Sequence, residues 1–159
     1  MDEAIGGWKR GELTIIAARP GMGASMMGLT LSNHLILHTS VRVLLISNQR
    51  TSNQVLRQLI SRNLKISMGK LNSGKLSTEE FESACELLNA LSSSNLSICD
   101  SKTLTTEMVK QLSVECEAEF VLLDYVGGLA SGVDHDSWRI GADLKELAVQ
   151  QKIPVVALT

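Results

Sequence analysis

The sequence predicts an α/β fold in which a mostly parallel sheet is flanked by helices on both faces. Short aliphatic runs alternate with segments of helical periodicity along the 159 residues. The composition is 44% hydrophobic but only 3% aromatic, which suits Val, Ile and Leu strands buried between helices. No internal repeat interrupts the alternation, so we expect right-handed crossovers between parallel strands and a single domain over residues 1–159.

The first half of the chain gives two strands and three helices. Leu13–Ala17 is an aliphatic strand, and a helix over Ala24–His38 follows a glycine-rich turn. Val41–Ser47 is a second buried strand. Helices then begin at Thr51 and Ser77, because each is followed three residues later by Gln or Glu, as in a capping box. The Gly69–Gly74 stretch between these helices is expected to be a loop.

The second half repeats the pattern after a Ser92–Ser94 loop. Asn95–Cys99 is a strand, and apolar residues at helical spacing from Leu104 to Cys116 predict a helix. Phe120–Asp124 is an apolar strand that ends in a carboxylate. A helix over Asp136–Gln151 and a strand over Pro154–Thr159 complete the order.

Charge and cysteine usage indicate a cytoplasmic protein without a membrane segment. Net charge is −2, but residues 100–159 carry five basic and ten acidic side chains, so phosphate binding there would meet repulsion. Cys85, Cys99 and Cys116 are odd in number and lack metal-type spacing, which predicts reduced core thiols. No apolar stretch has the length needed to span a membrane.

The stretch between the first strand and the first helix has the form of a phosphate-binding loop, and one residue in it is anomalous. The loop comprises Ala18, Arg19, Pro20, Gly21, Met22, Gly23, Ala24 and Ser25. Its glycines and the helix N-terminus suit phosphates, and Ser25 with Asp124 suits Mg²⁺. Ala24, however, stands where such loops carry the lysine that neutralises the β- and γ-phosphates. The alternatives are a structural glycine turn and, for Asp124, a solvated strand-end carboxylate.

These motifs together resemble the RecA-like ATPase domain of the DnaB-type replicative DNA helicases, a P-loop NTPase fold. The resemblance runs from about Ile5 to Thr159. It rests on Ile5–Leu13 with its paired glycines, Ile15–Gly23 with its Ala-Arg-Pro-Gly-Met-Gly string, Leu71–Ser77, Leu122–Tyr125 and Ile153–Leu158. It implies ATP and Mg²⁺ as cofactors, and partners among DNA replication proteins.

Two departures from the family bear on activity. The family's lysine is Ala24, and its catalytic glutamate falls on Gln49, whose amide cannot act as a general base. The resemblance also implies that the chain lacks the family's final strands, arginine finger and N-terminal assembly domain. We therefore expect a catalytically inactive homologue with at most weak ATP/Mg²⁺ binding, which acts by docking on a replicative helicase or another replication protein.

Two alternatives remain open: an ATPase or helicase domain that works only within an oligomer, and a structural remnant without activity. The loop Gly127–Asp136 matches a DNA-facing loop of the family, but its acidic residues predict an ordinary loop and weak single-stranded DNA binding at most. His34 and His38 are four residues apart; with only His135 as a third candidate, they are expected to be surface or packing residues. Met26 and Met27 are expected to fill gaps in the core.

Overall fold

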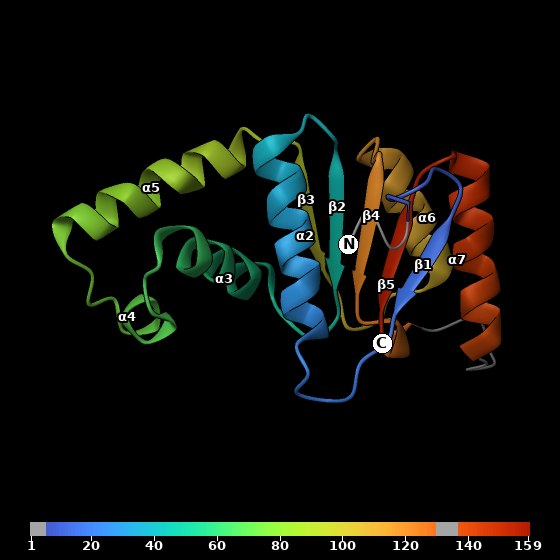
Figure 1. Ribbon diagram of the computed structural model, residues 1–159, viewed down its shortest axis with the longest axis horizontal. Helices are drawn as coiled ribbons and strands as arrows, with labels where there is room; N and C mark the ends of the chain where they lie inside the picture. Colours follow the sequence, from blue (N-terminus) through green and yellow to red (C-terminus); the bar gives the residue numbers. More distant parts are fainter. Residues whose placement is uncertain (1–5, 130–136) are drawn as a thin grey trace.

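A computed structural model describes residues 6–129 and 137–159, and in these residues five strands form one parallel sheet (Figure 1). The strand order is β1-β5-β4-β2-β3, and because every neighbouring pair is parallel, each strand is connected to the next in the chain by a crossover. The strands are β1 (Leu13–Ile16), β2 (Val43–Ser47), β3 (Leu96–Asp100), β4 (Phe120–Asp124) and β5 (Val155–Leu158). The predicted α/β fold class is confirmed.

Helices cover both faces of the sheet. Alternate residues of each central strand enter two different apolar clusters, because successive side chains of a strand point to opposite faces. One cluster packs under α6 (Thr106–Glu115) and α7 (Ser137–Gln151). The other packs under α2 (Ala24–His38) and α3 (Ser52–Leu64), with Leu91 of α5 (Thr78–Ser92) joining it. Figure 1 shows α4 (Met68–Ser73) and the first turns of α5 lying away from the sheet.

The sheet register places polar strand ends beside one another. The central strands β2 and β4 are buried along all five residues, whereas the edge strands β1 and β3 are largely half-buried. Ser47 at the end of β2 is aligned with Asp100 of β3 and with Asp124 of β4. In open parallel sheets, ligands bind at this carboxyl edge. The edge therefore brings the first-strand loop and two aspartates to one end of the molecule.

Helix α2 approaches the sheet closely because it carries a glycine at the contact. A Cβ atom on Gly28 would lie 2.7 Å from Leu158 Cδ1 and 3.2 Å from Leu122 Cδ2. Both leucines are buried in the sheet, so neither has open space to move into. The glycine fixes the distance between α2 and the sheet, and with it the position of the loop that precedes α2.

Most element boundaries agree with those predicted from the sequence, but the prediction for one segment was wrong. The Gly69–Gly74 stretch is not a loop, since Met68–Ser73 is a short helix. Ser67 caps it by accepting a hydrogen bond from the Lys70 N–H, and Gly74 ends it with a left-handed backbone. No residue of this helix is buried, so it has no apolar periodicity that the sequence could reveal.

Two expectations about core side chains also need correction. Met26 does not fill the core: it is 45% exposed and lines a surface pocket, while Met27 is half-buried. The three cysteines are free thiols as expected, but each is half-buried rather than fully in the core. Cys99 and Cys116 pack at the margin of the cluster beneath α6 and α7. Burial raises the pKa of the Cys99 thiol, with smaller contributions from Asp100 and Cys116.

Candidate nucleotide site

The loop between β1 and α2 has the backbone geometry of a phosphate cradle. Gly21 and Gly23 have φ angles of +82° and +88°, a region that side chains with a Cβ rarely adopt. Gly23 is the N-cap of α2 and has no side chain to cap the helix. The first N–H groups of a 15-residue helix therefore face the loop without a side-chain acceptor, which favours an anion there.

A pocket of about 450 Å³ lies against this loop. Its lining comes from the loop, from the segment after β2, from the segment after β4 and from the chain end after β5. The lining residues are Ala18, Arg19, Pro20, Gly21, Gly23, Ala24, Ser25, Met26, Gln49, Arg50, Tyr125 and Thr159. Four separate parts of the sequence thus converge on one hollow at the carboxyl edge of the sheet.

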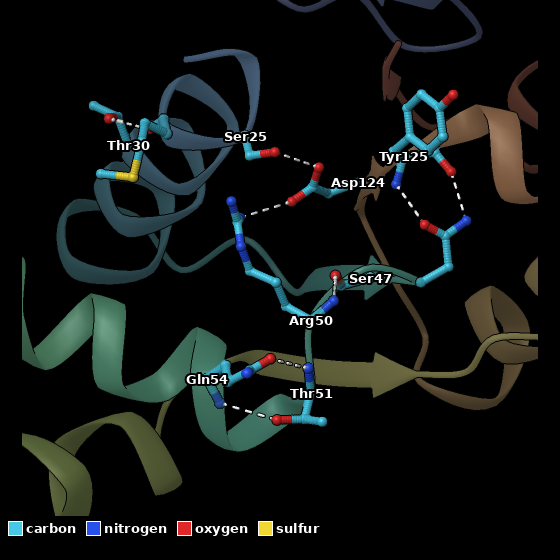
Figure 2. A network of polar contacts seen from close by, with 10 residues as sticks. Ser25, Thr30, Ser47, Arg50, Thr51, Gln54, Asp124 and Tyr125 are labelled. Carbon is cyan, nitrogen blue, oxygen red and sulfur yellow. Dashed lines mark hydrogen bonds and ion pairs between the residues drawn. The ribbon is translucent and has the colours of Figure 1, made fainter. Parts of the chain in front are cut away.

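Asp124 is not itself a lining residue of this pocket, but it is held between two residues that are, Ser25 and Arg50 (Figure 2). Ser25 Oγ donates a hydrogen bond to Asp124 Oδ1 at 2.8 Å, and Arg50 Nη1 lies 3.1 Å from Oδ2. The Asp124 side chain is 7% exposed and that of Arg50 is 24% exposed. A carboxylate so deeply buried needs a counter-charge, and the Arg50 guanidinium supplies it.

The segment that carries Arg50 is fixed to β4 by a side-chain amide. Asn48 Nδ2 donates to the Tyr125 carbonyl at 2.7 Å, and the Tyr125 N–H donates to Asn48 Oδ1 at 3.1 Å. The Arg50 N–H donates to Ser47 Oγ at 3.1 Å (Figure 2). This pair of amide hydrogen bonds, here called the Asn48–Tyr125 clasp, continues the contact of β2 with β4 beyond the ends of the strands.

Most of the residues expected to form the site come together. Asp124 lies below the loop, bonded to Ser25, and Gln49 reaches the same pocket. Ala24 is half-buried at the start of α2 and offers only a methyl group. Met22 and Asp124 are the two predicted residues that do not belong to the pocket lining found in the described residues: Met22 is 76% exposed, whereas Asp124 is buried behind Ser25 and Arg50.

Sequence reasoning missed four residues of the pocket: Met26, Arg50, Tyr125 and Thr159. Arg50 is the most important of them, because it is a cation beside a glycine-rich loop that carries no lysine. Its only signal in the sequence is a charged residue three positions after Ser47, the end of the buried strand. That position does not reveal that the side chain turns back to Asp124, which lies 74 residues away.

The contact of Arg50 with Asp124 competes with Mg²⁺. Ser25 donates its proton to Oδ1, which leaves the lone pairs of its oxygen for a metal ion, but the Arg50 guanidinium occupies Oδ2 of the carboxylate that a hydrated ion would also need. A divalent ion placed there would also face the guanidinium at close range. The Mg²⁺ site expected at Ser25 and Asp124 remains a prediction, and the Arg50 contact weighs against it.

The remaining candidates give no second site in the part of the chain that the structure describes. His34 and His38 are exposed with ring centroids 4.9 Å apart, and His135 lies outside the described residues. Within residues 6–129 and 137–159, no three His, Cys, Asp or Glu side chains are grouped to hold a metal. In the same residues, no helix combines the length and apolarity needed to cross a membrane.

The expected DNA-facing loop is described only at its start. Val126–Gly128 form one short 3₁₀ turn after β4. Residues 130–136, including the acidic positions on which the prediction of weak DNA binding rested, lie outside the described residues. That prediction therefore stays a prediction.

Comparison with known proteins places the chain in a family. The model of the DnaB-like helicase C terminal domain matches residues 1–159. The replicative DNA helicase DnaB of Nostoc sp. is 27% identical over 168 residues, which cover 100% of this chain and 19% of that protein. A probable plasmid replicative DNA helicase of Chlamydia muridarum is 28% identical, covering 94% of this chain and 35% of that protein.

Solved structures share the fold. A structure of a DnaB-like replicative helicase and its interactions with primase matches with a TM-score of 0.85 at 24% identity, covering 96% of this chain and 39% of that one. A second solved structure, described as an ATPase domain, matches with a TM-score of 0.88 at 23% identity, covering 99% of this chain and 60% of that one. The chain thus spans about a fifth to a third of the length of the two helicases from Nostoc and Chlamydia. It belongs to the family of DnaB-like helicase C-terminal domains and has their RecA-like fold.

Proposed function

We propose that this chain is a DnaB-like helicase domain of DNA replication that binds a nucleotide weakly and does not hydrolyse ATP. The observation that carries the proposal is the pair Ala24 and Gln49, which both line the pocket. A phosphate loop uses lysine to stabilise charge on the transferred phosphoryl group, and a base or a polarising residue to orient the attacking water. Both groups are missing from one site whose scaffold is retained.

The scaffold supports weak binding. Gly21, Gly23 and the N-terminus of α2 favour an anion in the pocket. Losing one charged contact costs about 2–5 kcal/mol, or roughly 30- to several-thousand-fold in affinity. Residues 1–159 then act as one RecA-like unit whose role lies in contacts with other replication proteins, a replicative helicase foremost. One structural relative is described with its primase interactions, and primase is a further candidate partner.

Phosphate release in the presence of Mg²⁺ and single-stranded DNA tests the loss of hydrolysis. We expect no turnover above that of Asp124→Ala, which serves as the blank because it removes the strand-end carboxylate. Turnover that disappears in Asp124→Ala would instead support an ATPase that works within an oligomer. Size-exclusion chromatography of the same sample, with and without ATP, would then show whether an assembly supplies the missing groups.

DNA binding is tested separately. Fluorescence anisotropy with a labelled single strand at physiological salt should give only weak binding that falls further as salt rises, because the second half of the chain is acidic. Submicromolar affinity would contradict this part of the proposal. It would point to DNA itself as the partner.

A further inference from the structure

We propose that the Arg50 guanidinium is the resident cation of this site, so that the phosphates of a nucleotide bind without Mg²⁺. The inference rests on the proposed nucleotide binding and names the form of nucleotide that the site takes. Arg50 lines the phosphate-loop pocket and is ion-paired to Asp124 across 3.1 Å. It does two things that a metal ion does in a phosphate-loop protein: it neutralises the strand-end carboxylate, and it offers groups that can bind phosphate oxygens, here N–H donors, at the pocket.

The first role follows from burial. The Asp124 side chain is 7% exposed, and a bare carboxylate at that depth would repel phosphates in the adjoining pocket. With Arg50 on one oxygen and the Ser25 hydroxyl on the other, that repulsion is largely cancelled. No further cation is needed beside Asp124 for the adjoining pocket to accept an anion.

The second role follows from the donor geometry of arginine. A guanidinium has five N–H donors in a planar fork, and the contact with Asp124 uses Nη1. The Arg50 side chain remains 24% exposed and borders the pocket, so other donors of the fork can reach phosphate oxygens. The Asn48–Tyr125 clasp and the Ser47 hydroxyl hold the backbone of this segment in place. The cation is therefore positioned before any ligand arrives.

Mg²⁺ in solution should weaken binding at such a site. ATP in excess Mg²⁺ carries the metal on its β- and γ-oxygens, which are the atoms that Arg50 and the loop N–H groups would contact. The metal-bound form would also bring a second cation towards the guanidinium. The site should consequently prefer ATP in EDTA, in contrast to an ordinary phosphate-loop site.

The test is calorimetric titration of the chain with ATP, once in EDTA and once in excess Mg²⁺. We expect the affinity in EDTA to equal or exceed that in Mg²⁺. Affinity about tenfold or more higher in Mg²⁺ would overturn the inference and leave weak nucleotide binding intact. No binding in either buffer would overturn both the inference and the proposed nucleotide binding, so the two failures are distinguishable.

Three variants locate the effect. Asp124→Asn should keep or raise the affinity in EDTA because it releases Arg50 to the phosphates, whereas a metal-dependent site would lose affinity in Mg²⁺. Arg50→Met combined with Asp124→Asn removes both charges, so no buried carboxylate is left unpaired to threaten folding. We expect it to weaken binding in EDTA about 10- to 100-fold, as for the loss of a charged hydrogen bond. Arg57→Met, which removes an exposed guanidinium from α3, should bind like the parent. Unchanged binding in the double variant would assign the affinity to the loop alone and refute the role of Arg50.

Discussion

Replacing Arg50 by Met should lower the free energy of unfolding, and the size of that decrease measures how much Asp124 depends on its counter-charge. The Met side chain fills similar space but leaves a carboxylate that is 7% exposed with Ser25 as its remaining hydrogen-bond partner among the described residues. Breaking a buried ion pair costs about 3–5 kcal/mol. Arg50 is 24% exposed, so part of that attraction is screened by water, and we expect a loss of about 2–3 kcal/mol in the free energy of unfolding.

Thermal and urea unfolding, followed by circular dichroism, measure this loss. For a chain of this size, about 2–3 kcal/mol corresponds to a Tm lower by about 4–12 °C. Adding Asp124→Asn to Arg50→Met should recover at least half of the loss, because the uncompensated charge is gone. Arg57→Met is the matched control, since Arg57 makes an exposed hydrogen bond to Asn72, and it should change stability by less than about 0.5 kcal/mol. If Arg50→Met and Arg57→Met were equally stable, the ion pair between Arg50 and Asp124 would be refuted for the protein in solution.

Three further predictions concern packing, phosphate binding and thiol chemistry. Gly28→Ala should lower the free energy of unfolding by about 1 kcal/mol, because the added methyl meets a buried leucine at 2.7 Å. Gly141→Ala in α7 should instead raise it by about 0.5–1 kcal/mol, because outside its own helix backbone an added Cβ meets no atom of the described residues within 4 Å. Urea titrations that give both changes the same sign would contradict the close approach of α2. Ala24→Lys should raise the affinity for ATP about 10- to 100-fold, since it adds one ammonium group to a loop that is already shaped for phosphates. Calorimetry measures the affinity, and no gain would mean that the loop is only a structural turn. Burial disfavours the Cys99 thiolate and raises the pKa of the thiol above its ordinary value of 9.0, so the pH midpoint for alkylation of Cys99 should lie above 9.0. Peptide mass spectrometry follows the alkylation, and a midpoint at or below 9.0 would be inconsistent with a buried thiol.

The fold was predictable where local chemistry and burial agree. Ala24–His38 and Phe120–Asp124 begin and end where the sequence indicates, and both predicted capping boxes form, at Thr51 with Gln54 and at Ser77 with Glu80. Each signal is contained within a few residues. The helix Met68–Ser73 was missed because glycine and the absence of buried positions outweighed its serine cap.

The site was predictable in its scaffold and not in its charges. The loop, Gln49 and Asp124 follow from strand ends that must meet at one edge of a parallel sheet. The contact of Arg50 with Asp124 depends on the direction of a long side chain after β2 and on the alignment of β2 with β4. Neither is encoded in a local pattern. The exposure of Met26 was missed for a similar reason, since helix periodicity does not say which face is turned to the pocket.

The Asn48–Tyr125 clasp has a consequence for insertions and deletions. Three residues, 48–50, connect the end of β2 to Thr51, the cap of α3, and both ends of this connection are fixed. At its start, Asn48 is hydrogen-bonded to the backbone of Tyr125, and just after its end the Ser52 N–H donates a hydrogen bond to the Asp100 carboxylate. Adding or removing one residue would turn Gln49 and Arg50 away from the pocket, whereas exchanging their side chains leaves the path of the backbone intact. Related sequences should therefore vary in the residues of this connection far more readily than in its length.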